Sequence, residues 1–313
     1  MLVGATNGHL FPGPFTRPHV GGFDALVVEI SRPGNGIGYL THGFLGADTA
    51  VAVASAPDGV PCWLARYGPD PDSGTYGWWR EGGIGCLVRE GSTWFIIWHA
   101  FGTSTGDRLH GLTVTEAGDF VMVGGTTAAI AGTDPPFGGL DGFVMVFARG
   151  SGVAPALTMR WVRRIGTPGD DVAQGVALDT EGRVLVSGRT RGDRLGPAAQ
   201  NAGGEDVFLL AFDDDGFELG RWQFGSAEDD VAYAAAAAPD GDLYVVGATD
   251  APGSSVRSTG AQRVPGTHAA LTTPCARAAV HGSWWYVPHL ALDPYGRGRL
   301  LLLERTTSAS MVA

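Results

Sequence analysis

Four aspartates recur at equivalent places along the chain, each eleven residues before a glycine that closes a tight turn. They are Asp48, Asp107, Asp171 and Asp230. Carboxylates at such places accept backbone N–H hydrogen bonds within their own turn or bind calcium. One acid per repeat lacks the closely spaced acids of a dedicated calcium loop. We therefore expect turn acids, with calcium as the alternative and no other cofactor.

The segment DSGTYGWWREGG contains Trp78, Trp79 and Arg80. Two adjacent tryptophans and an arginine in a loop can form an aromatic platform for a sugar or a protein partner. The other interpretation, which the sequence leaves open, is that the tryptophans fold back over the edge of a sheet. A second aromatic cluster, HGSWWYVPH at 281–289, is better explained by core packing.

No residue is assigned a catalytic role. GTSTG at 102–106 matches the G-x-S-x-G nucleophile elbow, but that motif needs a strand, a sharp turn and then a helix. The segment that follows is strand-like, so we interpret the match as accidental. A glycosidase needs two carboxyl groups at catalytic separation. Glu81, Asp134 and Asp193 break the repeat pattern, yet nothing in the sequence singles them out.

Composition excludes several function classes. The net charge of −11 over 313 residues argues against a nucleic-acid partner, which needs clustered Lys and Arg. No apolar run is long enough to span a membrane, and we expect a monomeric module. The start, MLVGATNGHLFPG, does not resemble a signal peptide. Either the protein is cytosolic, or its true N-terminus lies outside this chain.

The sequence contains an internal repeat of about sixty residues. Its turn glycines are separated by 59, 64, 59 and 55 residues, and they are Gly59, Gly118, Gly182, Gly241 and Gly296. We expect a single domain over 1–313. Its repeat units lie at about 7–66, 67–126, 127–190, 191–249 and 250–306, and residues 1–6 form a partial repeat.

Each repeat contains four short strands, here named A to D in chain order. Strand A is rich in small residues, strand B in β-branched ones, strand C follows a glycine pair, and strand D is aromatic. The run Ala234–Ala238 is expected to be a strand, because it aligns with A strands rich in Val and Leu and because small side chains suit a crowded innermost strand. The pattern predicts an all-β fold, a β-propeller of about five four-stranded blades.

These motifs resemble the bacterial SBBP β-propeller repeat. The resemblance lies in GGxD before strand C (Gly21–Asp24, Gly138–Asp141, Gly203–Asp206), Phe-Gly or Ile-Gly after strand D, and V-x-G-x-T in strand B. It covers nearly the whole chain and implies a secreted or cell-surface protein with a binding or adhesive role. Two repeats depart from the pattern. The second has Gly85 where Asp is expected, and the fifth has Trp285 in place of its Asp.

The number of blades stays open. A closed ring of five would join strands near 288–304 to strands near 24–46 and would leave Leu2–Thr6 over. The alternative is a piece of a longer propeller.

The two ends of each sheet differ in the sequence. A–B and C–D turns are tight, whereas the B–C loops are long: 7–22, 67–83, 127–139, 191–204 and 250–266. Long loops on one face of a rigid scaffold are common binding sites. We therefore predict a non-enzymatic binding or adhesion module whose glycan or protein ligand contacts this face. A carbohydrate-active enzyme and a purely structural segment are the alternatives.

The three cysteines have no metal-like spacing. Cys62 in strand B and Cys86 in strand C of one blade come within a residue of facing each other if Arg66 pairs with Gly83. A cross-strand disulfide is therefore a hypothesis, with Cys275 left free.

Overall fold

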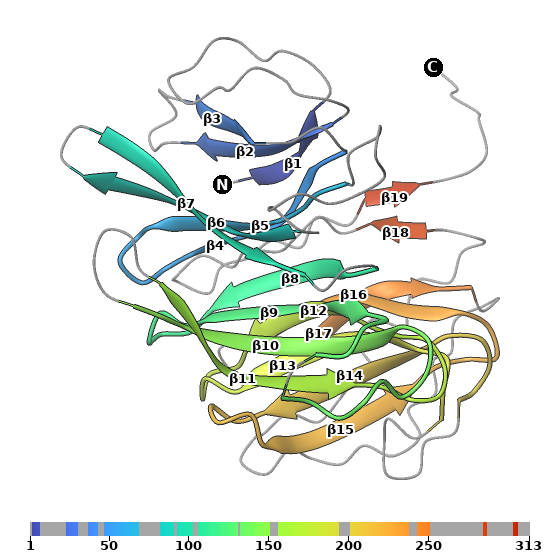
Figure 1. Cartoon of the computed structure of the whole chain (residues 1–313). Helices are drawn as coiled ribbons and strands as arrows, with labels where there is room; N and C mark the ends of the chain where they lie inside the picture. The colour runs from blue at the N-terminus through green and yellow to red at the C-terminus, as the bar shows by residue number, and fades with distance from the viewer. Residues whose placement is uncertain are drawn as a thin grey trace, which may run out of the picture. The chain divides into compact units, whose positions relative to one another are not determined.

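The computed structural model is all-β, and the residues that it describes contain no helix (Figure 1). These residues are 2–6, 23–30, 37–42, 47–68, 82–90, 93–102, 106–130, 132–150, 156–193, 201–237, 243–250, 284–286 and 303–305. The predicted fold class is confirmed, because the sheets are antiparallel and resemble propeller blades.

Three sheets have four strands each, and neighbouring strands in the chain are neighbours in the sheet. The first comprises β4 (Thr49–Ser55), β5 (Pro61–Arg66), β6 (Gly82–Glu90) and β7 (Thr93–Phe101). The second comprises β8 (Arg108–Val114), β9 (Phe120–Thr126), β10 (Asp141–Arg149) and β11 (Leu157–Ile165). The third comprises β12 (Asp171–Leu178), β13 (Val184–Thr190), β14 (Asp206–Phe212) and β15 (Glu218–Phe224). Each sheet reproduces the predicted A-to-D order.

Three smaller sheets complete the described strands. They are β1 (Leu2–Thr6) with β2 (Asp24–Ile30) and β3 (Ile37–His42), β16 (Asp230–Ala237) with β17 (Leu243–Thr249), and β18 (Trp284–Tyr286) with β19 (Leu303–Arg305). Trp285 pairs with Glu304, 19 residues on, as Asp171 pairs with Thr190. The fifth repeat thus keeps the A–B register, and Trp285 takes the place of the aspartate.

The chain folds into two compact units, Met1–Pro136 with Val144–Val162, and Phe137–Phe143 with Arg163–Ala313. In the first unit, Ala25 and Val27 pack with Trp63 and Leu87, which joins the β1–β3 sheet to the β4–β7 sheet. In the second, Trp222 belongs to a cluster that joins the β12–β15 sheet to β16 and β17. The boundaries proposed for one domain of five repeats stay a prediction.

The alanine run is a strand, as predicted. Ala234 to Ala237 pair with Val246 to Leu243, and Ala238 lies outside the described residues. A Cβ added to Gly175 on β12 would lie 2.7 Å from the Ala234 Cα. The two A strands therefore approach so closely that only small residues fit, which overrides the helix propensity of alanine.

A closed ring of five blades would leave Leu2–Thr6 over, but the structure includes this segment in a sheet. β1 pairs with β2 along its whole length, so it holds the B position of the first sheet. Its last pair is Thr6 with Asp24, the same threonine–aspartate pair that Thr190 and Asp206 form between β13 and β14. The segment has the composition of a B strand, and strand C provides its partner.

The A–B turns are uniform. Gly59, Gly118 and Gly182 have φ of 79°, 91° and 78°, a left-handed conformation that favours glycine. Each donates its N–H to the carbonyl three residues earlier, at 2.8 to 3.1 Å. In the three four-stranded sheets, strands A and B are therefore joined by a short, repeated turn.

Candidate functional site

The opposite end of each sheet, where D–A connections meet B–C loops, contains the repeated acids. In the second unit it forms a first corner, residues 137–141 with 164–171. The Asp171 Oδ2 accepts hydrogen bonds from the Thr167 N–H at 2.6 Å and hydroxyl at 2.8 Å. The Asp170 Oδ1 accepts one from the Leu140 N–H at 2.9 Å.

A second corner, residues 202–206 with 223–230, repeats these bonds. The Asp230 Oδ2 accepts hydrogen bonds from the Ser226 N–H at 2.5 Å and hydroxyl at 2.7 Å. The Asp229 Oδ1 accepts one from the Glu205 N–H at 2.8 Å. The turn role predicted for Asp171 and Asp230 is confirmed in both corners.

The remaining two repeated acids lie in the first unit. The Asp48 Oδ1 accepts a hydrogen bond from the Gly68 N–H at 3.2 Å, and the Asp107 Oδ1 accepts one from the Thr126 hydroxyl. Within the described part of the chain, no group of three or more His, Cys, Asp or Glu residues could hold a metal ion. Calcium at the four acids stays a prediction.

The acids that open strand C are buried in both corners. The Asp141 Oδ2 accepts hydrogen bonds from the Phe137 N–H at 3.0 Å and from Arg164 at 2.9 Å, and the two paired side chains are 0% and 1% exposed. At the equivalent place, the Asp206 Oδ2 accepts one from the Gln223 side-chain amide at 3.0 Å. Sequence reasoning missed both donors, although each directly precedes the Ile-Gly or Phe-Gly motif.

Burial perturbs these carboxyl groups. It raises the pKa of Asp171 to about 6, assisted by the negative charge of Asp141, while hydrogen bonds from Thr190 and Thr167 oppose the shift. Burial likewise raises the pKa of Asp206 above its ordinary value. Such shifts suit general acids, but Asp171 has no exposed surface to offer a substrate.

The glycine pair of GGxD allows a close approach. A Cβ on Gly139 would lie 2.2 Å from the Asp170 Oδ1, and one on Gly204 would lie 2.0 Å from the Asp229 Oδ1. Glycine therefore lets the B–C loop reach the D–A connection. The motif is structural, as its recurrence suggests.

The second repeat needs a correction, because Gly85 does not stand at the aspartate position. Arg66 pairs with Gly82, whereas its equivalent Arg189 pairs with Val207, the residue after Asp206. The residue before Gly82 is Glu81, which lies outside the described residues. Gly85 instead faces Trp63, whose ring would be 2.5 Å from an added Cβ. The glycines of this strand thus make room for tryptophan.

The predicted ligand residues Trp78, Trp79 and Arg80 lie outside the described residues, so their role stays a prediction. Of the acids considered for a glycosidase, Asp134 and Asp193 are exposed, and the Asp193 Oδ1 accepts a hydrogen bond from the Asn201 N–H at 2.7 Å. After GTSTG the chain enters β8, a strand, which confirms that the elbow match is accidental.

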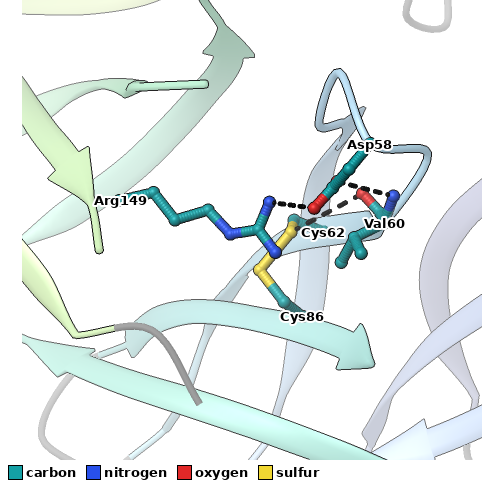
Figure 2. Close-up of a disulfide and its surroundings, with 5 residues drawn as sticks. All are labelled: Asp58, Val60, Cys62, Cys86 and Arg149. Atoms are coloured by element: carbon teal, nitrogen blue, oxygen red, sulfur yellow. Dashed lines mark hydrogen bonds and ion pairs between the residues drawn. A yellow bond between two sulfur atoms is a disulfide. The ribbon is translucent and has the colours of Figure 1, made fainter. Parts of the chain in front are cut away.

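Cys62 and Cys86 form a disulfide between β5 and β6 (Figure 2). The hypothesis is confirmed, with one change: Arg66 pairs with Gly82, so the cysteines face each other directly. Both are buried. Arg149 of β10 points toward the disulfide and forms an ion pair with Asp58 at 2.7 Å (Figure 2). Cys275 lies outside the described residues.

Comparison with known families supports the fold. Residues 160–196, which run from β11 through β12 and β13, match the family model described as SBBP, a beta-propeller repeat. The class defined by fold and repeat is thus a β-propeller repeat protein, and this part of the chain is similar to the SBBP repeat. Comparison with curated proteins gave no match. Within the part of the chain that the structure describes, there is no helix that could cross a membrane.

Proposed function

We propose that this protein is a non-enzymatic binding or adhesion module. Its glycan or protein ligand contacts the end of the sheets where the B–C loops and the D–A connections meet. The observation that carries the proposal is the contrast between the two ends. At one end of the four-stranded sheets, strands A and B are joined by similar glycine turns. The other end holds internally bonded acids, and it is the end at which the sequence has long B–C loops that differ from one another. A rigid base with variable loops is a common binding architecture.

The internal bonding of the acids argues against the enzymatic alternative. A catalytic carboxyl must reach the substrate, whereas Asp141, Asp171, Asp206 and Asp230 are at most 1% exposed. A glycoside hydrolase would therefore have to use acids outside the repeat pattern. Incubation of the protein with polysaccharides should release no reducing ends.

The disulfide supports a location outside the cytoplasm. Disulfides persist in oxidising compartments and are rare in the cytosol. Together with the SBBP resemblance, this favours a secreted or cell-surface protein. A monomeric module is part of the same proposal.

The test is a glycan array and a polysaccharide pull-down, with wild-type protein and a Trp78→Ala/Trp79→Ala variant, each with calcium and with chelator. Stacking on aromatic rings contributes much of the energy of such sites, so the variant should lose about tenfold or more in affinity. Phe217→Ala is the control, because Phe217 is 66% exposed but lies in a C–D turn at the opposite end. Equal binding by wild type and the tryptophan variant would contradict this site.

A further inference from the structure

Every described A strand except the short β18 contains a β-bulge at the same place. The strand pairing skips one residue between Ala50 and Ala52, Leu109 and Gly111, Ala173 and Gly175, and Ala232 and Ala234. The skipped residues are Val51, His110, Gln174 and Tyr233. A bulge inserts an unpaired residue and redirects its side chain, and bulges are common beside functional sites.

The bulge residue is more exposed than both of its neighbours in each strand. In β16, Tyr233 is 39% exposed while Ala232 is fully buried. In β12, Gln174 is partly exposed between the buried Ala173 and Gly175. Each strand therefore leaves this one residue more exposed than the residues on either side of it.

The flanking residues are alike between repeats, whereas the bulge residues differ in chemistry. Seven of the eight flanking residues are Ala or Gly, and the exception is Leu109. The four bulge residues carry an aliphatic side chain (Val51), an imidazole (His110), an amide (Gln174) and a phenol (Tyr233). Specific function on a repeated fold depends on residues that vary upon a constant scaffold, and the bulge is such a position.

Two bulge residues of the second unit lie at matched positions on adjacent strands. A Cβ on Gly175 would lie 2.7 Å from the Ala234 Cα, so the residues that directly follow the two bulges are in contact. Gln174 and Tyr233 precede this contact by one residue each. The bulges also occupy the fourth of eight residues in both β12 and β16, in the half of each strand that follows the D–A connection.

The chemistry of this pair indicates a neutral ligand. Gln174 is partly exposed, so its side-chain amide can exchange hydrogen bonds with the hydroxyl groups of a ligand. Tyr233 offers an aromatic face and a phenol beside a surface of alanines. The nearest acids on these strands, Asp171 and Asp230, bond within their own corners.

We propose that Gln174 and Tyr233 form a saccharide-binding site on the A strands of the second unit. The phenol ring stacks on the C–H face of a sugar, and the Gln174 amide exchanges hydrogen bonds with its hydroxyls. This inference rests on the proposed binding function and names neutral oligosaccharides as its ligand class.

The experiment is calorimetric titration of the full chain with cellohexaose, maltohexaose, xylohexaose, mannohexaose and chitohexaose, with hexagalacturonate as the charged comparison. We expect at least one neutral sugar to bind. Tyr233→Ala should weaken that binding about tenfold or more, and Gln174→Leu about fivefold to tenfold, as expected for a lost stacking contact and a lost hydrogen bond. Tyr233→Phe keeps the ring and should retain most of the affinity.

Controls separate this site from the loop site. Phe217→Ala should bind as the wild type does, and unchanged melting temperatures show that the variants fold. Failure of every neutral sugar, or binding of hexagalacturonate alone, overturns the proposal. Binding that is lost in Trp78→Ala/Trp79→Ala but unchanged in Tyr233→Ala and Gln174→Leu also overturns it, while the proposed function stands.

Discussion

The two corners of the second unit have the same hydrogen-bond pattern but a different charge balance. In the first, Asp141 meets the guanidinium of Arg164 at 2.9 Å. In the second, Asp206 meets the neutral amide of Gln223 at 3.0 Å. The donor type changes, while the acceptor, its burial and the backbone bonds around it do not. The corner is therefore specified by its geometry, and an ion pair is one of two ways to complete it.

The difference bears on whether these acids act in function. A buried ion pair contributes little net stability compared with a well-packed neutral pair, but it is costly to break. The first corner should therefore depend strongly on both partners. The second should tolerate loss of charge, because the raised pKa of Asp206, caused chiefly by burial, shows that its charge is costly there.

The largest expected effect is the contrast between Asp141→Asn and Asp206→Asn. The first change leaves the Arg164 guanidinium, 1% exposed, without its carboxylate. Breaking a buried pair in this way costs about 3–5 kcal/mol. The second change removes a charge opposite an amide and should cost about 1 kcal/mol, the value of an ordinary hydrogen bond. Urea unfolding at neutral pH measures both.

Arg164→Gln is the matched control, because it gives the first corner the donor that the second already has. The loss in free energy of unfolding should be clearly smaller in Arg164→Gln than in Asp141→Asn. Equal losses of stability in Asp141→Asn and Asp206→Asn would contradict the comparison.

A smaller effect is expected in the pH dependence of stability. Burial raises the pKa of Asp171 from 3.8 to about 6 in the folded protein. Between these values the native state binds more protons than the unfolded state, so the contribution of Asp171 to the free energy of unfolding falls as pH rises. The full change is on the order of 2–3 kcal/mol. Asp171→Asn cannot titrate and should gain stability relative to wild type from about pH 4 to pH 7.

Asp58→Asn is the control with the opposite sign. Burial raises the pKa of Asp58, but the Val60 N–H and Arg149 outweigh it and hold that pKa below its ordinary value. The contribution of Asp58 is therefore lost as pH falls, and Asp58→Asn should lose stability relative to wild type as pH rises. The free energy of unfolding of each variant, relative to wild type, is measured at a series of pH values. If this difference changed with pH in the same direction for both variants, the assignment would be refuted.

Local signals made most of the fold predictable. Turn glycines such as Gly182 reflect a left-handed conformation that few other residues adopt, and the strand pattern is periodic. The register of pairing between strands was harder to predict from the sequence. Gly85 looked like part of a GGxD motif, but it makes room for Trp63 on the neighbouring strand, which only the register reveals.

The candidate sites were predictable to a smaller extent. The aspartates of the GGxD motifs stand out in the sequence. The donors to Asp141 and Asp206 are Arg164 and Gln223, which do not recur as one residue type and so could not be predicted. The bulges at Gln174 and Tyr233 are a property of pairing between two strands. No single segment contains that information.

The smallest effects should be alike in both corners. Thr167 and Ser226 each donate a hydroxyl to the repeated aspartate, at 2.8 and 2.7 Å, and each hydroxyl accepts a backbone N–H two residues on. Thr167→Ala and Ser226→Ala should therefore each cost about 1 kcal/mol, and Thr167→Ser should recover most of the loss.

The Thr167 change also sharpens the comparison through titration. Hydrogen bonds from Thr167 lower the pKa of Asp171, so their partial loss in Thr167→Ala should raise that pKa further. The midpoint at which Asp171 titrates, followed by NMR of its carboxyl carbon, should move to higher pH in this variant. Since Thr167→Ser retains the donor, its midpoint should stay near the wild-type value. A midpoint that is the same in Thr167→Ala as in wild type would mean that the hydroxyl does not bond the ionised carboxylate, and the shared pattern of the two corners would then rest on the backbone alone.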